Sequence, residues 1–537
     1  MSTHKLTILI IAGLVACNID AAVEEYSNGR GGGEWSDPAT WRSSKVPSPE
    51  ATVVIGRDDV VLFDRNDVDR VTCRELYIDK KGMLSFKMKT GPIRAAIGGF
   101  IETYGTIRLD GTARRDDRIE LHMVGSDPAK RTISLKEGGS LTVIGRTDTD
   151  DGKPNAIISS IRDDKRVQYD SAHIVAQRGS GLDLTRAHVI NVAITAHGLD
   201  NTGAEFNERL NVTESLFTDN SHISMNGCDT PLIANNRFER NNEHTFFGGA
   251  IAMNGCSLPD IHNNEIIGRY QLAIYALQMN DGAVVSNIID GAGVGLHWDG
   301  MHVMVQDMTI RNCDSAIQLS DRAAGAIDGL VTEGCKEVLD YQGFVQISNW
   351  ITPSPPTDTS MISCRHGALE LLNTSIEPEQ TRREPEYEVL HHGQPYYDRW
   401  VRDGVPARPM IQASCYLVVG LNGDVPPNAR IEVRTANPAQ PIAAGAIDPN
   451  VRNSPALVGP NNLTPLPGSL TALIVKAWRT GQDGVVVKTP TYTVSVQVPG
   501  AEDGSYTTVQ TIDVTPDSSW LRPALDDVTP TVTFTFP

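Results

Sequence analysis

The sequence is poor in positive charge and in aromatic side chains. It holds 47 Lys and Arg against 66 Asp and Glu, which gives a formal net charge of −19, and aromatic residues make up 6% of its 537 residues. Such a surface repels nucleic acid and anionic membranes, so neither is expected as a partner, and an anionic substrate would need a local cluster of Arg or Lys. The 47 Gly and 31 Pro favour short strands and turns over long helices.

Familiar catalytic and metal-binding signatures are also missing. The chain has no GxSxG, HExxH, P-loop, EF-hand loop or CxxC spacing, and it lacks the paired aspartates and GHG of polygalacturonase-type glycosidases. These absences weaken the case for an enzyme and leave no firm cofactor or metal site. Calcium is a candidate at the corner residues Asp281, Asp299 and Asp321, but aspartates in such positions are better interpreted as Asx turns.

A long apolar run occurs only at the N-terminus. Lys5 precedes the stretch Leu6–Val15, which is too short to span a bilayer and indicates a secretory signal within residues 1–22. Leu14 to Cys17 resembles a bacterial lipobox, which would leave a lipid on Cys17, whereas cleavage near Ala21 or Ala22 would release a free protein. We therefore expect a secreted, periplasmic or cell-surface protein that contacts a membrane only through such an anchor.

Two similar phrases, ISMNGC (223–228) and IAMNGC (251–256), reveal a repeat of 28 residues (251 − 223). Strand-like segments with an apolar centre recur every 20 to 28 residues, at Phe217, Phe238, Ile266, Ile288, Ile310, Val331 and Ile351. Each is followed by a strand in which apolar and polar residues alternate, as expected for one buried face. This period, with Asn and Gly at the corners, predicts an all-β, right-handed parallel β-helix, the hand being that of the commoner form.

In such a solenoid, residues one coil apart lie above one another. The two phrases should then stack, and this register places Cys228 on Cys256 and Cys313 on Cys335. The spacing allows disulfides between coils. A ladder of buried free thiols is the favoured alternative, because Cys packs well as a small apolar residue.

Changes in this pattern predict the domain boundaries. The solenoid is expected from about residue 50, with clear repeats over residues 151–375. Residues 376–408 are charged and proline-rich, which suggests a linker. Over residues 409–537, strand-like runs divided by Pro and Gly predict a C-terminal β-sandwich.

Residues 31–56, GGGEWSDPATWRSSKVPSPEATVVIG, resemble the start of a G8 domain, and the glycine-punctuated strands that follow extend the likeness over residues 30–150. G8 domains occur in extracellular proteins with pectin-lyase-like parallel β-helices, and some relatives bind or depolymerise hyaluronan. The resemblance implies a carbohydrate connection but supplies no catalytic motif. From the residues alone, Trp35 and Trp41 are expected to plug the open end of the solenoid, with ligand binding as the alternative.

Outward residues on stacked strands should form a flat strip that suits a polymer. If Ile274 and Val294 point inward, Tyr275 and His297 face outward on adjacent coils, offset by two residues and roughly 5 to 9 Å apart. A sugar ring could then lie between them. A His base and a Tyr acid can together cleave a uronic-acid glycan by β-elimination.

Other polar residues are expected to bind the substrate of this strip. Amides there could hydrogen-bond sugar hydroxyls, and nearby arginines could neutralise a carboxylate. These candidates are Asn226, Asn254 and Gln318 for the hydroxyls, and Arg240 and Arg269 for the carboxylate.

The sequence thus predicts an exported β-helix whose partner is an extracellular polysaccharide. The leading hypothesis is a lyase of uronic-acid glycans. The alternative is a non-catalytic glycan-binding or adhesive surface protein, which the missing signatures favour, since Tyr, His and Arg are ordinary residues on a solvated strip.

Overall fold

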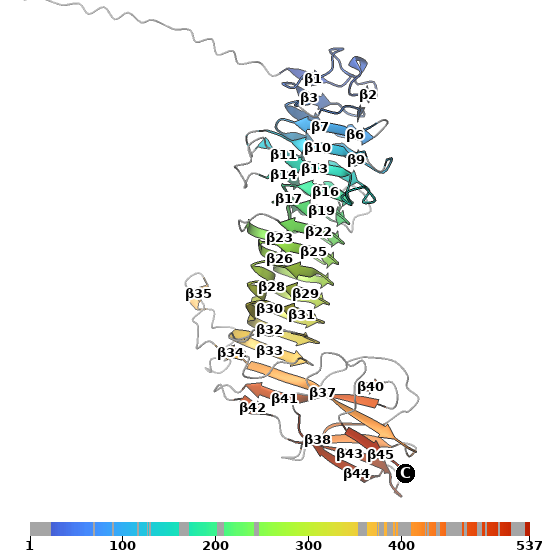
Figure 1. Ribbon diagram of the computed structural model, residues 1–537, viewed down its shortest axis with the longest axis vertical. Coiled ribbons are helices and arrows are strands. Elements are labelled where there is room, and N and C mark those ends of the chain that lie inside the picture. The colour runs from blue at the N-terminus through green and yellow to red at the C-terminus, as the bar shows by residue number, and fades with distance from the viewer. Residues whose placement is uncertain are drawn as a thin grey trace, which may run out of the picture.

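The computed structural model shows an all-β chain in which a column of stacked coils leads into a C-terminal domain (Figure 1). It describes residues 23–537 apart from 68–69, 88–90, 115–116, 126, 128–129, 161–170, 201–208, 241–245, 353–361, 373, 375–380, 384–389, 392–393, 396–409, 425, 427–428, 436–440, 447–463, 467–469, 481–485, 489–490, 503–504 and 517–531. Cys17 and the predicted signal segment lie outside the described residues. Within the described part, no helix is long and apolar enough to cross a membrane.

The column has three faces, and on each face the strands pair in parallel with their counterparts one coil away. Face 1 begins with β1 (Glu24–Tyr26), β3 (Thr52–Ile55), β5 (Glu75–Ile78), β8 (Ile101–Thr103), β11 (Thr132–Leu135), β14 (Ala172–Ala176), β17 (Val192–His197), β20 (His222–Asn226) and β23 (Phe246–Asn254). Face 2 begins with β2 (Gly32–Glu34), β4 (Val60–Phe63), β6 (Met83–Lys87), β9 (Thr106–Asp110), β12 (Ser140–Ile144), β15 (Gly181–Thr185), β18 (Leu210–Thr213), β21 (Leu232–Ala234) and β24 (Asp260–His262). Face 3 comprises β7 (Ile93–Ile97), β10 (Ile119–Met123), β13 (Ala156–Ser160), β16 (Ala187–Ile190), β19 (Leu216–Thr218), β22 (Arg237–Arg240), β25 (Glu265–Gly268), β27 (Ile288–Asp290), β29 (Thr309–Arg311) and β31 (Val331–Glu333). This arrangement is the predicted parallel β-helix.

Toward the C-terminal end of the column, the strands of faces 1 and 2 become continuous. These long strands are β26 (Tyr270–Val285), β28 (Val294–Gln306), β30 (Ser315–Asp328), β32 (Glu337–Ser348) and β33 (Ile362–Leu372). β34 (Thr381–Arg383) pairs in parallel with the first part of β33, and β37 (Met410–Asn422) pairs with its last part. The column therefore continues into the segment that was expected to be a linker.

β37 also starts the C-terminal domain. It pairs antiparallel with β41 (Leu470–Thr480) and in parallel with β45 (Val532–Thr535), while β40 (Thr464–Leu466) and β42 (Val486–Lys488) pair with β41. β39 (Pro441–Ala446), β38 (Arg430–Thr435), β43 (Tyr492–Pro499) and β44 (Tyr506–Val514) form a second sheet, and β35 (Leu390–His391) pairs separately with β36 (Gln394–Pro395). Buried residues such as Leu417 and Val419 of β37 share a core with Ile431 and Val494 of the second sheet. These two sheets make the predicted β-sandwich.

The WSDPATW motif closes the N-terminal end of the column. Trp35 and Trp41 are almost fully buried, their ring centroids lie 5.0 Å apart, and the Trp41 indole N–H donates to the Trp35 carbonyl. Between them, the Asp37 carboxylate accepts a hydrogen bond from the Ala39 N–H and caps the 3-10 helix η1 (Pro38–Thr40). The motif thus has the structural role expected of it. The column itself begins earlier than residue 50, because β1 pairs with β3 from Glu24 onward.

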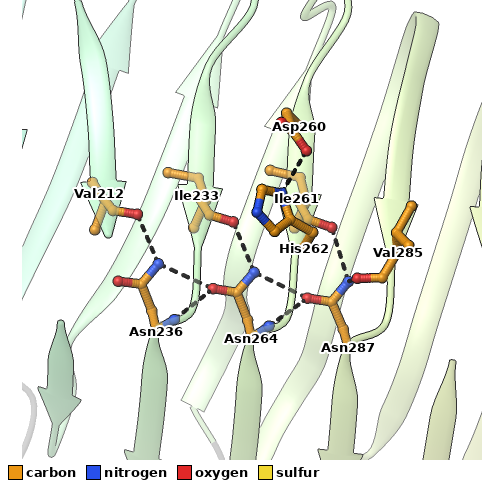
Figure 2. A network of polar contacts seen from close by, with 9 residues as sticks. All are labelled: Val212, Ile233, Asn236, Asp260, Ile261, His262, Asn264, Val285 and Asn287. Carbon is orange, nitrogen blue, oxygen red and sulfur yellow. Dashed lines mark hydrogen bonds and ion pairs between the residues drawn. The ribbon is translucent and has the colours of Figure 1, made fainter. Parts of the chain in front are cut away.

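A ladder of asparagines follows the corner between faces 2 and 3 (Figure 2). Asn236, Asn264 and Asn287 are buried, and each Nδ2 donates to a backbone carbonyl of the preceding coil. The Oδ1 of Asn264 accepts hydrogen bonds from both the side chain and the backbone N–H of Asn236, and Asn287 does the same for Asn264. The amides therefore satisfy buried backbone groups at a corner, where the regular strand pairing is interrupted.

The ladder also determines which residue of face 3 points inward. The inward residue comes two places after each ladder asparagine, so Ile289 is fully buried whereas Ile288, the predicted core residue, is 43% exposed. Farther along, the buried residues are Thr332 and Trp350 rather than the predicted Val331 and Ile351. Where two apolar residues are adjacent, the sequence does not show which of them points inward. The hydrogen bonds at the corner determine which one does.

The two cysteine pairs are stacked free thiols. Cys228, Cys256, Cys313 and Cys335 are all buried, and none is in a disulfide. A hydrogen bond from the Cys256 thiol lowers the pKa of Cys228 to about 7, and one from Cys313 does the same for Cys335. This confirms the favoured thiol ladder over cross-linked coils.

The thiol ladder predicts strong protection from reagents. In native protein, these four cysteines should not react with a thiol-specific chromogenic disulfide, because burial excludes the reagent. After denaturation without reductant, all four should react, as measured by absorbance and by mapping the labelled peptides. Recovery of a Cys228–Cys256 or Cys313–Cys335 disulfide peptide would contradict the ladder.

The asparagine ladder predicts a large loss of stability on its interruption. Asn264→Ala leaves buried groups of two neighbouring coils without partners, so it should lower the free energy of unfolding by about 3 kcal/mol. Chemical denaturation followed by circular dichroism can measure this. Asn254→Ala, on the exposed end of β23, is the matched control and should change stability by less than about 0.5 kcal/mol. Similar losses for both variants would contradict the role of the ladder.

Candidate functional site

The candidate site is a row of outward side chains on face 1. Strand pairing places these residues in one register line: Thr195, Ser224, Ala252, Tyr275, His297, Gln318 and Asp340. The neighbouring inward line is fully buried Ile and Leu, from Ile194 to Leu339. The row, here called the face 1 strip, therefore rests on a close-packed base that holds the strand backbones in place.

Tyr275 and His297 are brought together at the middle of the strip. Their ring centroids lie 5.1 Å apart with the ring planes at 53°. The two residues pair directly, without the predicted two-residue offset, because Leu296 and not Val294 aligns with Ile274. Rings this close leave no room for a sugar between them, so a sugar would have to lie across both.

Amide side chains continue the strip on both sides of this pair. His297 Nδ1 lies 3.4 Å from Oε1 of Gln318, within hydrogen-bonding distance on the next coil. On the preceding coils, Asn254 Nδ2 donates to Oδ1 of Asn226 over 3.4 Å. All three predicted hydroxyl-binding residues thus lie on face 1, Gln318 in the strip and Asn226 and Asn254 in the parallel row two residues farther along the strands.

Asp299 is a neighbour of Tyr275 that sequence reasoning placed in a turn. Partial burial raises the pKa of Tyr275, and the negative charge of Asp299 raises it further. The Oδ1 atom of Asp299 is buried and has no hydrogen-bond partner among the described residues. Both effects favour the protonated phenol, and the buried Oδ1 atom is closed to solvent.

The two arginines expected to neutralise a substrate carboxylate do not join this group. Arg240 is buried, donates to Oδ1 of Asn220 over 2.8 Å and lies 5.9 Å above the Tyr270 ring. The prediction that Arg240 contacts a substrate carboxylate is therefore wrong, because the Asn220 amide and the Tyr270 ring compensate its buried charge. Arg269 is exposed, but it precedes Tyr275 by six residues, roughly 20 Å along an extended strand.

The predicted calcium residues do not converge within the described part of the chain. No group of three or more His, Cys, Asp or Glu side chains that could hold a metal occurs there. Asp281 is exposed with a φ of 31°, consistent with a corner residue. The side chain of Asp321 lies outside the described residues.

A hydrogen-bonded chain of Glu120, His122 and Ser159 lies on face 3 and was not anticipated. His122 Nε2 lies 2.6 Å from Glu120 Oε2, and its Nδ1 is hydrogen-bonded to Ser159 Oγ. The residue types are those of a hydrolase triad, but His122 and Ser159 are almost fully buried, so the serine is inaccessible to a polymer. The chain therefore serves to satisfy buried polar groups between adjacent coils.

Comparisons with known proteins do not identify a family for this chain. No protein-family model and no curated protein matches the chain, so the G8 resemblance stays an expectation. Among solved structures, the Dettilon tailspike protein is similar at 9% identity and a TM-score of 0.30, over 82% of this chain and 78% of that one. A double mutant of the tailspike protein of E. coli bacteriophage HK620, in complex with a pentasaccharide, is similar at 10% identity and a TM-score of 0.24, over 87% and 93%. At these TM-scores, both below 0.5, the likenesses show nothing about the function of this chain.

The Glu120 chain predicts a pH-dependent contribution to stability. Burial raises the pKa of Glu120, but the hydrogen bond from His122 and the charges of His122 and Arg94 outweigh it, so the net pKa is lowered. The stabilisation is therefore present above the ordinary glutamate pKa of about 4.3 and is lost as pH falls through the lower folded value. Thermal unfolding from pH 7 to 3 should show a smaller acid-induced loss for Glu120→Gln than for the wild type.

The exposed Glu333 provides the matched control for this measurement. Glu333→Gln should leave the pH profile unchanged, because its side chain is about half exposed and screened by solvent. Superimposable profiles for Glu120→Gln and the wild type would contradict the assignment.

Proposed function

We propose that this protein is an exported polysaccharide-binding β-helix whose face 1 strip cleaves uronic-acid-containing glycans by β-elimination. The observation that carries the proposal is the direct pairing of Tyr275 with His297, with ring centroids 5.1 Å apart, within a continuous outward row. A flat row of small and amide side chains suits a long polymer, and the row has its acid and base candidates at one point.

The proposed reaction needs a base, an acid and a way to stabilise the substrate carboxylate. His297 removes the proton from the sugar carbon beside the carboxylate, and the electron pair forms a carbon–carbon double bond as the glycosidic oxygen leaves. Tyr275 donates its phenolic proton to that oxygen; burial and the Asp299 charge raise the pKa of the phenol, which keeps the proton in place but makes Tyr275 a weaker acid. Gln318 is positioned to donate its amide N–H groups to the carboxylate, because its Oε1 faces His297.

The proposal includes export to the outside of the cell or the periplasm. It rests on the apolar segment after Lys5 and the alternative cleavage sites near Cys17 and Ala21. Lipidation of Cys17 would place the polysaccharide-binding column at a membrane surface.

Non-catalytic glycan binding is the second candidate function, and one observation favours it. Neither Arg240 nor Arg269 reaches the Tyr275–His297 pair, so no predicted cation neutralises a bound carboxylate. An amide stabilises the developing charge less than a guanidinium does. A strip that only binds would tolerate this arrangement.

A uronic-acid polysaccharide panel tests the proposed reaction. β-Elimination creates a conjugated double bond, so absorbance near 235 nm should rise with the correct substrate. His297→Ala and Tyr275→Phe should each lower kcat roughly 100-fold or more while the thermal unfolding temperature is retained. His262→Ala, a partly exposed histidine on face 2 that pairs with Asp260, and Tyr104→Phe are the matched controls and should keep full activity.

Two results would separate the candidate functions. Retained binding to a polysaccharide without any absorbance change over the whole panel would favour the binding protein and overturn the lyase. Turnover that survives both His297→Ala and Tyr275→Phe would place the chemistry elsewhere on the column.

A further inference from the structure

A cavity of about 380 Å³ lies at the N-terminal end of the column, far from the middle of the face 1 strip. It opens between the loop that follows the WSDPATW motif and the loop that follows β4. Its lining is Ser36, Val46, Pro47, Pro49, Arg65, Arg70, Val71 and Thr72. This volume is in the range of small-molecule sites, and the cavity is here called the cap pocket.

A buried carboxylate holds the two arginines of the cap pocket. Asp67 is fully buried, and its Oδ1 accepts from Arg65 Nη2 over 2.9 Å and from Arg70 Nε over 2.8 Å. Its Oδ2 accepts from the Thr72 hydroxyl over 2.8 Å. The guanidinium groups are therefore held by the same anchor, which reduces the entropy lost when they bind a ligand.

Each arginine has hydrogen-bond donors that Asp67 and the other described residues are not seen to engage. Asp67 takes one N–H group from each guanidinium, and it is the one ion-pair partner found for either within the described part of the chain. Arg70 is 61% exposed, so its remaining N–H groups are open to solvent, whereas Arg65 is mostly covered at 16%. In particular, the Nε contact of Arg70 leaves both of its terminal nitrogens for a two-point contact with a carboxylate.

The charge and shape of the cap pocket favour an organic anion. Within the cluster of Arg65, Asp67 and Arg70, two guanidinium groups face one buried carboxylate, in a chain whose formal net charge is −19. Asp64 does not line the cavity, and its carboxylate accepts from the backbone N–H and hydroxyl of Ser36. The opposite wall, Val46, Pro47 and Pro49, is apolar and can cover the carbon skeleton of a ligand.

We propose that the cap pocket is a second binding site, specific for small organic carboxylates. An acidic monosaccharide has the size that fits this pocket. Arg70 and Arg65 bind the carboxylate, and the valine–proline wall covers the ring. This site does not depend on the proposed chemistry of the face 1 strip, because the two lie on different coils and share no residue.

Titration calorimetry on the full chain tests the proposal with D-glucuronate, acetate, D-glucose and inorganic sulfate as probes. Glucuronate and acetate should both bind. Glucuronate should bind more tightly, because its ring also packs against the apolar wall. Glucose should give no heat of binding. Arg70→Ala should weaken glucuronate binding at least about 10-fold, since a charge-assisted two-point contact is lost. Arg57→Ala, an exposed arginine outside the cavity that pairs with Asp58, is the control and should leave binding unchanged.

Further variants keep the proposal falsifiable. Arg70→Lys retains the positive charge but not the two terminal nitrogens of the guanidinium, so it should also weaken glucuronate binding. This variant keeps the test valid if Arg70→Ala does not fold. His297→Ala should bind glucuronate normally, which separates this site from the face 1 strip. Equal binding of glucose and glucuronate, equal binding of sulfate and glucuronate, or unchanged affinity in both Arg70 variants would each overturn the assignment.

Discussion

The whole molecule depends on in-register hydrogen bonding between successive coils. Each strand of the column pairs in parallel with the strand one coil away, so a side chain meets the same position of its neighbours. This constraint produces the buried line from Ile194 to Leu339, the asparagine ladder and the stacked thiols. It also produces the Tyr275–His297 pair, which no local feature of either strand would create. Functional geometry in this fold is therefore a consequence of register.

Register also explains what the sequence could and could not predict. The echo of ISMNGC in IAMNGC identified the coil, the stacked Asn-Gly corners and the cysteine pairs, because both phrases keep the same length to the next corner. The step from Ile274 to Leu296 was misassigned by two residues, since Val294 and Leu296 are both apolar and either could continue the line. Periodicity of apolar residues cannot distinguish such neighbours.

Residues at strand ends were the least predictable part of the candidate site. Arg240 ends β22 and, as a charged residue, was expected in solvent, yet it is buried and compensated by Asn220, in the turn before β20, and by Tyr270 of β26. Asp299 was assigned to a turn, but β28 runs on through the corner, and the carboxylate stays beside Tyr275. Both errors have one origin: the partners come from other coils, and a single sequence does not show which coils meet at a corner.

In the reaction proposed above, Tyr275 and His297 would take different roles because their neighbours differ. A general acid and a general base work together only if their environments favour opposite protonation states near the same pH. Tyr275 meets this condition through burial and the adjacent Asp299 charge, which both favour the protonated phenol. His297 instead faces the Oε1 of Gln318, an uncharged acceptor that can fix one nitrogen as a donor and leave the other free to accept a proton. In the proposed reaction, the coils on either side thus supply the groups that would assign acid and base, because the register that brings the two rings together also sets the neighbours of each.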